Sequence, residues 1–174
     1  MKRIIFSYGA LAGAIVIGSM ILGFSLGDGQ GVSASQWLGY LIMLVALSLI
    51  FLGIKRYRDR QLGGVIKFGT ALLLGLGISI VASLIYVAVW EAYLALTDYA
   101  FIDDYAQSVV AAKEAEGLAG AELQAEAAKL ESFKEQYANP MFRLPMTFLE
   151  IFPVGLLITL LAAALLRKSS FMPA

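Results

Sequence analysis

The chain has 174 residues, of which 60% are hydrophobic and 15% charged, with a mean hydropathy of +0.79. Soluble domains are about 45–50% apolar and about 25% charged, and here the apolar residues gather in long blocks, so we expect an integral membrane protein. The 13 basic and 13 acidic residues balance, which gives no general field for nucleic acid, and the chain contains neither cysteine nor histidine. This excludes disulfides, thiolate nucleophiles, thiolate metal sites and histidine as a general base or metal ligand.

Four stretches are long and apolar enough to cross the hydrocarbon core of a bilayer, which is ~30 Å thick. We predict transmembrane helices over residues 4–26, 36–54, 68–92 and 146–166. A signal peptide is the alternative for the first stretch, because Lys2 and Arg3 precede it. Its uncharged run exceeds the ~7–15 apolar residues of such a signal, so a retained helix is favoured. A glycine-rich turn at 27–31 and a basic connection from Lys55 to Lys67 join the first three helices.

Residues 101–142, between the third and fourth predicted spans, differ in kind from the rest of the chain. They contain three lysines and these eight acidic residues: Asp103, Asp104, Glu114, Glu116, Glu122, Glu126, Glu131 and Glu135. The segment is rich in good helix formers, Gly117 and Gly120 divide it, and apolar residues recur every three to four positions in its second half. Asn139 and Pro140 end the helical pattern. We therefore predict a helical hairpin or cap outside the bilayer.

Lysine and arginine set the expected orientation, because they favour cytoplasmic loops. The N-terminus carries two of them, the second connection five and the C-terminus two, whereas the first turn has none and the long third connection has four. Both termini are therefore expected in the cytoplasm and the acidic insert on the other side. The sequence thus predicts an all-α fold: a single domain over 1–174, built as a four-helix transmembrane bundle, N-in and C-in, with an extracytoplasmic helical insert.

Small residues recur at four-residue spacing on three of the predicted helices. In lipid, such ridges let helix backbones approach closely and gain dispersion contacts. The ridge residues are Gly9 and Gly13 in the first helix, Ala71, Gly75, Ser79 and Ser83 in the third, and Gly155, Thr159 and Ala163 in the fourth. They are interpreted as helix-packing positions, either within one bundle or between copies or partner proteins.

Glu91 and Glu150 are the candidate functional carboxylates, because they are the acidic residues near the outer ends of the spans. Counting from Arg167 places Glu150 about 25 Å along the helix, just inside the outer edge of the core. The same count from Lys67 places Glu91 about 36 Å away, nearer the headgroups. Glu150 has three interpretations: a cap, in a capping box with Thr147, or a structural polar contact; a partner of Arg143 or another fixed cation; or a transport or metal ligand.

Two further patterns are interpreted structurally. Pro153 lacks an amide proton, so we expect a helix kink there, either a static bend or a hinge. The run from Gly23 to Gly27 matches G-x-S-x-G, but it lies at a membrane helix end in a chain without histidine, so no serine hydrolase is expected. No catalytic, metal-binding or cofactor-binding residues are predicted.

At the last span the chain resembles a known family. The run from Thr147 to Leu160, TFLEIFPVGLLITL, followed by Arg167 and Lys168, is similar to the C-terminal signature of the uncharacterised bacterial DUF4199 membrane proteins. The glycine pair of the first helix, the basic second connection and the acidic insert agree with the same layout. The resemblance implies a small four-helix protein of the bacterial inner membrane, of unknown function. It carries no catalytic residues, so none transfer to this chain.

These features favour a non-enzymatic accessory, scaffold or structural protein of the membrane. The expected partners are the lipid bilayer, another copy or another membrane protein at the small-residue ridges, and a periplasmic protein at the acidic insert. The alternative is a small oligomeric transporter or channel for a proton, a cation or an amphiphile, with Glu150 and Glu91 in its path. An intramembrane enzyme that holds Mg²⁺ or Ca²⁺ through carboxylates is a weaker third hypothesis, because the sequence shows no ligand cluster.

Overall fold

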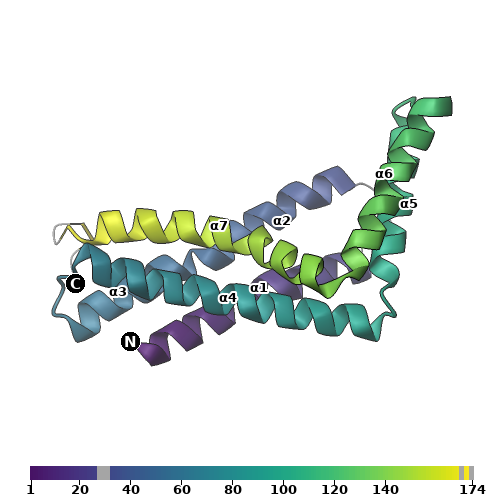
Figure 1. The fold of residues 1–174 in the computed structure, drawn as a ribbon. Helices are drawn as coiled ribbons and strands as arrows, with labels where there is room; N and C mark the ends of the chain where they lie inside the picture. Colours follow the sequence, from purple (N-terminus) through teal and green to yellow (C-terminus); the bar gives the residue numbers. More distant parts are fainter. Residues whose placement is uncertain (27–31, 169–170, 173–174) are drawn as a thin grey trace. The chain divides into compact units, whose positions relative to one another are not determined.

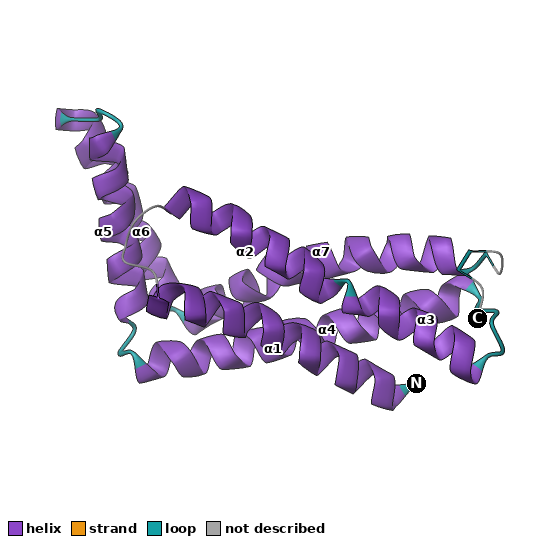
Figure 2. Ribbon diagram, turned by 180° about the vertical axis from the view of Figure 1, so that it is seen from behind, coloured by secondary structure: helices purple, strands orange, loops and turns teal. Residues whose placement is uncertain are grey.

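The computed structural model is all-helical wherever it describes the chain, which is at residues 1–26, 32–168 and 171–172, with side chains described except at 24–26 and 32–36. Figure 1 follows the helices along the chain, and Figure 2 shows the helices and loops from behind, coloured by secondary structure. The helices are α1 (Lys2–Leu26), α2 (Val32–Leu47), α3 (Leu49–Gln61), α4 (Phe68–Leu96), α5 (Ala100–Ala115), α6 (Gly120–Ala138) and α7 (Pro140–Leu166). The predicted turn at 27–31 lies outside the described residues.

Four stretches of the described chain are long and apolar enough to cross a membrane, which confirms the predicted all-α, four-span fold. They are Lys2–Gly23, Trp37–Gln61, Phe68–Leu96 and Pro140–Leu166. The chain forms two compact units, which are described separately below. Unit 1 contains residues 1–88 and 148–174, and unit 2 contains residues 89–147. The boundary between the units falls within α4 and within α7.

The second span differs from the predicted single helix over 36–54. It consists of α2 and α3, which meet at Ser48, and it continues to Gln61. The Ser48 hydroxyl donates to the Val45 carbonyl at 2.6 Å, a local bond that competes with regular helix geometry. Much of the predicted basic connection is thus helical, and Arg58 and Arg60 lie in the last turn of α3, where cations complement the helix dipole.

Unit 1 packs through close helix crossings. The small residues predicted for packing lie at these contacts: a Cβ placed on Gly9 would lie 2.7 Å from Val81 Cβ, and one on Gly75 would lie 2.5 Å from Thr159 Cγ2. Gly13 and Gly155 make comparable approaches, to the Ala82 carbonyl and to the Ser79 side chain. Unit 1 also contains fully buried aliphatic side chains, among them Leu47, Ile50, Ile54, Leu74 and Ile78.

Unit 2 is a helical hairpin with its two flanking helix ends. α5 and α6 lie side by side, as predicted, and Gly117 and Gly120 form the turn between them with φ values of +95° and +60°. The α4 helix ends at Leu96, four residues beyond the predicted position 92, and Asp98 and Tyr99 follow it in the left-handed region.

The last helix begins at Pro140 rather than at the predicted Met146, because Asn139 and Pro140 start α7 as well as stop α6. The Asn139 side-chain oxygen accepts the Met141 amide at 2.9 Å, and the Asn139 carbonyl accepts the Arg143 amide at 3.0 Å. The predicted capping box of Thr147 and Glu150 is therefore wrong, since both residues lie well inside α7. The helix also continues through Pro153.

Candidate functional site

The most highly connected charged residue of unit 2 is Arg143, in the first turn of α7. Its Nε and Nη2 atoms donate to the two carboxylate oxygens of Glu91, on the last turns of α4, each at 2.7 Å. The Arg143 side chain is 3% exposed and that of Glu91 25%, so water screens this bidentate pair little. An ion pair thus joins the helix that enters the hairpin to the helix that leaves it.

The remaining surroundings of Arg143 come from the hairpin itself. Its Nη1 donates to the Tyr137 carbonyl at 3.0 Å and to the Ala138 carbonyl at 3.4 Å, both at the end of α6. The guanidinium also lies over the rings of Tyr99 and Tyr137, at 5.1 and 5.7 Å from their centroids. A single guanidinium therefore satisfies the carboxylate of α4 and the free carbonyl groups at the C-terminus of α6.

Aromatic contacts extend this arrangement. Trp90 Nε1 donates to the Tyr137 hydroxyl at 2.8 Å, and the Trp90 ring meets Phe101 of α5 edge-on at 4.8 Å. We refer to these six residues as the base cluster: Trp90, Glu91, Tyr99, Phe101, Tyr137 and Arg143. Edge-to-face rings and charge-assisted hydrogen bonds both require defined geometry, so the base cluster fixes the two ends of the hairpin.

Local sequence places these side chains. The Tyr99 amide donates to the Leu94 carbonyl at 2.8 Å, which closes α4 with a tight turn and holds Tyr99 at φ +59°. A tyrosine in this region costs about 1 kcal/mol or more. The contact between Tyr99 and Arg143 offsets that cost.

Glu150 has different surroundings, in unit 1. Its carboxylate accepts the Tyr86 hydroxyl at 3.1 Å, and the same hydroxyl lies 2.9 Å from Met20 Sδ. Glu150 is exposed on the surface of unit 1, whereas Tyr86 is 4% exposed. The alternative in which Glu150 pairs with Arg143 is wrong, because the guanidinium binds Glu91. Within the described chain, no ion pair engages Glu150.

Buried hydroxyl groups form a second polar feature of unit 1. Ser79 Oγ lies 3.1 Å from Thr159 Oγ1 and donates to the Gly75 carbonyl at 2.9 Å. Ser83, one turn further along α4, is fully buried, and its hydroxyl has no hydrogen-bond partner among the described residues. The predicted packing serines therefore lie inside the bundle, as their small size requires.

The sequence pattern did not identify Arg58 as a buried residue, because Arg58 falls in the predicted basic connection from Lys55 to Lys67. The side chain is fully buried, and its Nη1 and Nη2 atoms donate to the carbonyls of Phe171 at 2.9 Å and Met172 at 2.5 Å. Nε pairs with Asp59 at 2.6 Å. The spacing of Ile50, Ile54 and Arg58 on one helix face was the available signal, because it continues the buried stripe of α3 by one turn.

Among the described residues, no three acidic side chains gather closely enough to hold a metal ion. The arrangement can therefore brace helix ends and present a surface, and it offers one exposed carboxylate on a predicted span.

In comparisons with known proteins, no curated protein and no solved structure matches the chain. The model of one family, described as a protein of unknown function, matches residues 7–168. The chain therefore belongs to the DUF4199 family, as its last span indicated.

Proposed function

We propose that this protein is a non-enzymatic accessory or scaffold subunit of the bacterial inner membrane, which presents the α5–α6 hairpin to a partner. The observation that supports the proposal is that Glu91 pairs with Arg143. This carboxylate is one of two candidates for a transport path, and both of its oxygens bind Arg143 at the base of the hairpin. A bidentate ion pair with arginine holds a carboxylate in one geometry. Such a pair suits a structural contact between helices better than a site that must bind and release an ion.

Isolation of the full-length protein in a mild detergent tests this role. We expect the wild-type chain to bring down another membrane protein or to migrate as a homo-oligomer. The Arg143→Ala variant is expected to lose that partner, because the hairpin ends are no longer braced, while Glu150→Gln retains it as the matched control. A wild-type protein that elutes as a clean monomer would contradict the proposal.

The proposal also includes an orientation, with the hairpin outside the cytoplasm. Substituting Glu122→Cys in the hairpin and Ser33→Cys at the start of α2 provides two labelling positions in a chain that has no cysteine. We expect an impermeant thiol reagent to label both positions in intact cells. Protection of both positions would overturn the orientation without affecting the scaffold role.

A small oligomeric transporter or channel remains the second candidate, and Glu150 is the residue that favours it. Its exposed carboxylate lies on a predicted span and receives a hydrogen bond from Tyr86 rather than a positive charge. Acidic residues at such positions are expensive and are commonly functional. In proteoliposomes that show wild-type flux, the Glu150→Gln variant should lose that flux; unchanged flux would exclude the carboxylate mechanism.

A further inference from the structure

Beyond the base cluster, α5 and α6 meet along one seam with regular helical spacing. From α5 the seam contains Asp103, Ala106, Gln107, Val110, Ala111 and Glu114, and from α6 it contains Ala127, Leu130, Glu131 and Lys134. Each set recurs at intervals of three and four residues, the spacing by which two helices face each other. Three of the ten seam positions are alanine, where well-packed helix pairs place large apolar side chains.

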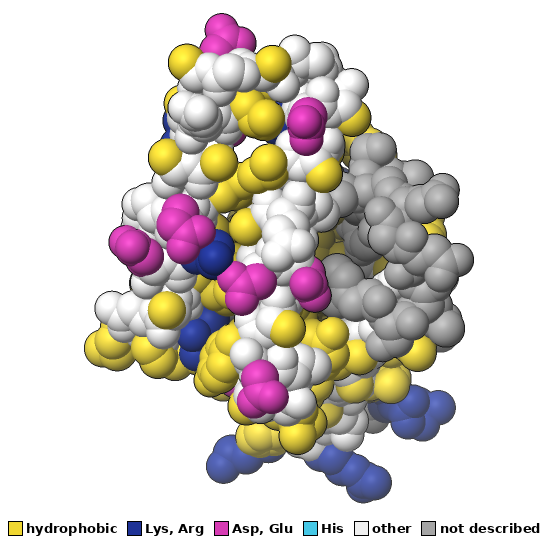
Figure 3. Space-filling view, turned by 90° about the vertical axis from the view of Figure 1, so that its right-hand side faces the viewer, with side chains coloured by type: hydrophobic (Ala, Val, Ile, Leu, Met, Phe, Trp, Pro, Cys, Tyr) yellow, Lys and Arg dark blue, Asp and Glu magenta, His cyan; other side chains and the backbone are white. Residues whose placement is uncertain are grey.

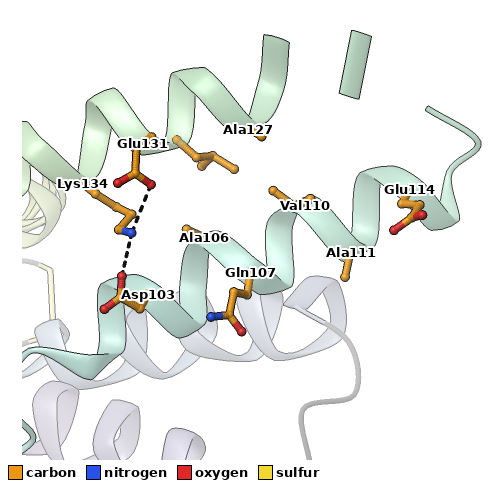
Figure 4. Close-up of a pocket in the computed structure, with 10 residues that line it drawn as sticks. Asp103, Ala106, Gln107, Val110, Ala111, Glu114, Ala127, Glu131 and Lys134 are labelled. Carbon is orange, nitrogen blue, oxygen red and sulfur yellow. Dashed lines mark hydrogen bonds and ion pairs between the residues drawn. The ribbon is translucent and has the colours of Figure 1, made fainter. Parts of the chain in front are cut away.

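The small side chains leave the seam open. A cavity of about 340 Å³ lies between the two helices, and Figure 4 shows Ala106 and Val110 of α5 facing Ala127 of α6 across it. At one end Lys134 bridges the helices by binding Asp103 at 2.7 Å and Glu131 at 3.1 Å. The Asp103–Lys134 ion pair thus links the two helices at this end, and the larger apolar side chains of the lining, Val110 and Leu130, leave the cavity unfilled.

Burial within the hairpin agrees with an unfilled seam. No side chain of α5 is buried, and the one buried side chain of α6 is Tyr137, which belongs to the base cluster. Helices of 16 and 19 residues are only marginally stable without an apolar face packed against something. A third helix laid into the seam would supply that packing.

Charge indicates what kind of helix fits. The hairpin segment 100–138 has eight acidic residues and three lysines, and each lysine is already paired within the hairpin. Glu114 at the rim of the cavity has no ion-pair partner within the described chain, and Figure 3 shows acidic side chains on both sides of apolar ones. The excess of negative charge repels the hairpin of a second copy and attracts a basic segment.

From this geometry we infer that the α5–α6 seam docks a basic amphipathic helix of a partner protein. A large apolar side chain of the partner fills the cavity beside Ala106 and Ala127, and its lysines or arginines meet Asp103, Glu114 and Glu131. In this mode of peptide recognition, an amphipathic helix inserts its apolar face into a groove of the protein that binds it. The inference rests on the proposed scaffold role and names the surface and the chemistry of the partner.

Photo-crosslinking of the full-length protein in native membranes tests the inference. The crosslinker benzoylphenylalanine replaces Ala127, inside the seam, or Ala128, its exposed neighbour on the same helix. We expect the Ala127 position to crosslink one partner segment with lysine or arginine on both sides of an apolar helical face, and the Ala128 position to give at least about tenfold less of that product. Crosslinks to lipid, to a second copy or to a segment without basic residues would overturn the inference.

Two pairs of variants, each with a matched control, test the cavity and the charge separately. With the crosslinker at Ala111 in the same seam, Ala127→Trp fills the cavity and should reduce the yield about tenfold, while Ala128→Trp leaves it unchanged. Glu114→Lys should reduce the yield as well, whereas Glu135→Lys, an equally exposed acid outside the seam, should not. Circular dichroism of each purified variant must show unchanged helix content.

The outcomes separate this inference from the proposed function. If Ala127→Trp still co-purifies with the native partner, the scaffold role stands and the seam is not the docking site. If the wild-type protein is a monomer with which no partner co-purifies, the scaffold role itself fails. If the crosslinked partner segment is basic and Ala127→Trp abolishes the crosslink to it, both proposals hold.

Discussion

The two units of this protein are stabilised in different ways. Unit 1 gains its stability from close backbone approach at Gly9, Gly13, Gly75 and Gly155, with large aliphatic side chains around these crossings. The hairpin of unit 2 buries almost nothing along its length and depends on charge-assisted hydrogen bonds and aromatic contacts at its base. The stability of unit 1 is therefore spread over many dispersion contacts, at every position where small residues recur. The stability of unit 2 depends instead on the few residues of the base cluster and their defined geometry.

Loss of Arg143 should have the largest effect, because it tests whether the base cluster holds unit 2 together. Arg143→Ala leaves Glu91 without its cation and two α6 carbonyls without a donor, which should cost about 3–5 kcal/mol. Thermal unfolding in detergent, followed by circular dichroism, measures the loss.

The double variant Glu91→Leu with Arg143→Met is the control for this experiment. It removes both charges together, so it should recover most of the stability lost in Arg143→Ala. If Arg143→Ala unfolds at the wild-type temperature, the base cluster does not stabilise the hairpin and the contrast between the units disappears.

Arg58 tests whether a polar residue is equally important in unit 1. Arg58→Met removes the donors to the Phe171 and Met172 carbonyls, with an expected cost of about 2–3 kcal/mol. The exposed Arg56→Met is the matched control and should change stability by less than about 0.5 kcal/mol. Carboxypeptidase digestion of the C-terminus should accelerate in Arg58→Met alone; equal rates in both variants would show that Arg58 does not retain the tail.

A pair of glycine substitutions on one helix tests the packing of unit 1. Gly75→Ala places a Cβ 2.5 Å from Thr159 Cγ2 and should cost about 1–3 kcal/mol, since the helices must separate. At Gly69 on the same α4 helix, no described atom lies within 4 Å of a new Cβ, so Gly69→Ala should be neutral or slightly stabilising. Equal unfolding temperatures for the two variants would contradict packing through small residues.

The smallest effect concerns pH and the exposed ion pairs of the hairpin. Hydrogen bonds to Asp103 and Glu131 raise the pKa of Lys134, so the folded protein holds this proton more tightly than the unfolded chain does. The contribution is fully present below pH 10.5, the ordinary lysine value, and is lost as the pH rises through the higher pKa of the folded protein.

Hydrogen exchange of α6 amides should detect this loss as faster exchange above pH 10.5, once the intrinsic base catalysis of exchange is subtracted. In Lys134→Met the additional acceleration should vanish. An identical pH dependence in wild type and variant would mean that the seam is held open by its helices alone.

The sequence alone determined the elements of this protein. Apolar runs of membrane-spanning length predicted the four spans, and the acidic, alanine-rich segment with Gly117 and Gly120 predicted the hairpin. Small residues at four-residue spacing predicted positions that lie at helix crossings in the structure. Each of these signals is local, because length, periodicity and helix propensity act over a few turns of one segment.

Only the tertiary structure decided which polar groups meet. Glu91 and Arg143 are 52 residues apart in the chain, and no local pattern distinguishes Glu91 from Glu150 as the partner of Arg143. The early start of α7, set by Asn139, places Arg143 on a helix and removes the capping explanation for Glu150. Arg58 is similar, because the carbonyl groups that it binds, those of Phe171 and Met172, lie more than 100 residues away. Side-chain pairing over such distances follows from how the helices pack, which sequence periodicity does not specify.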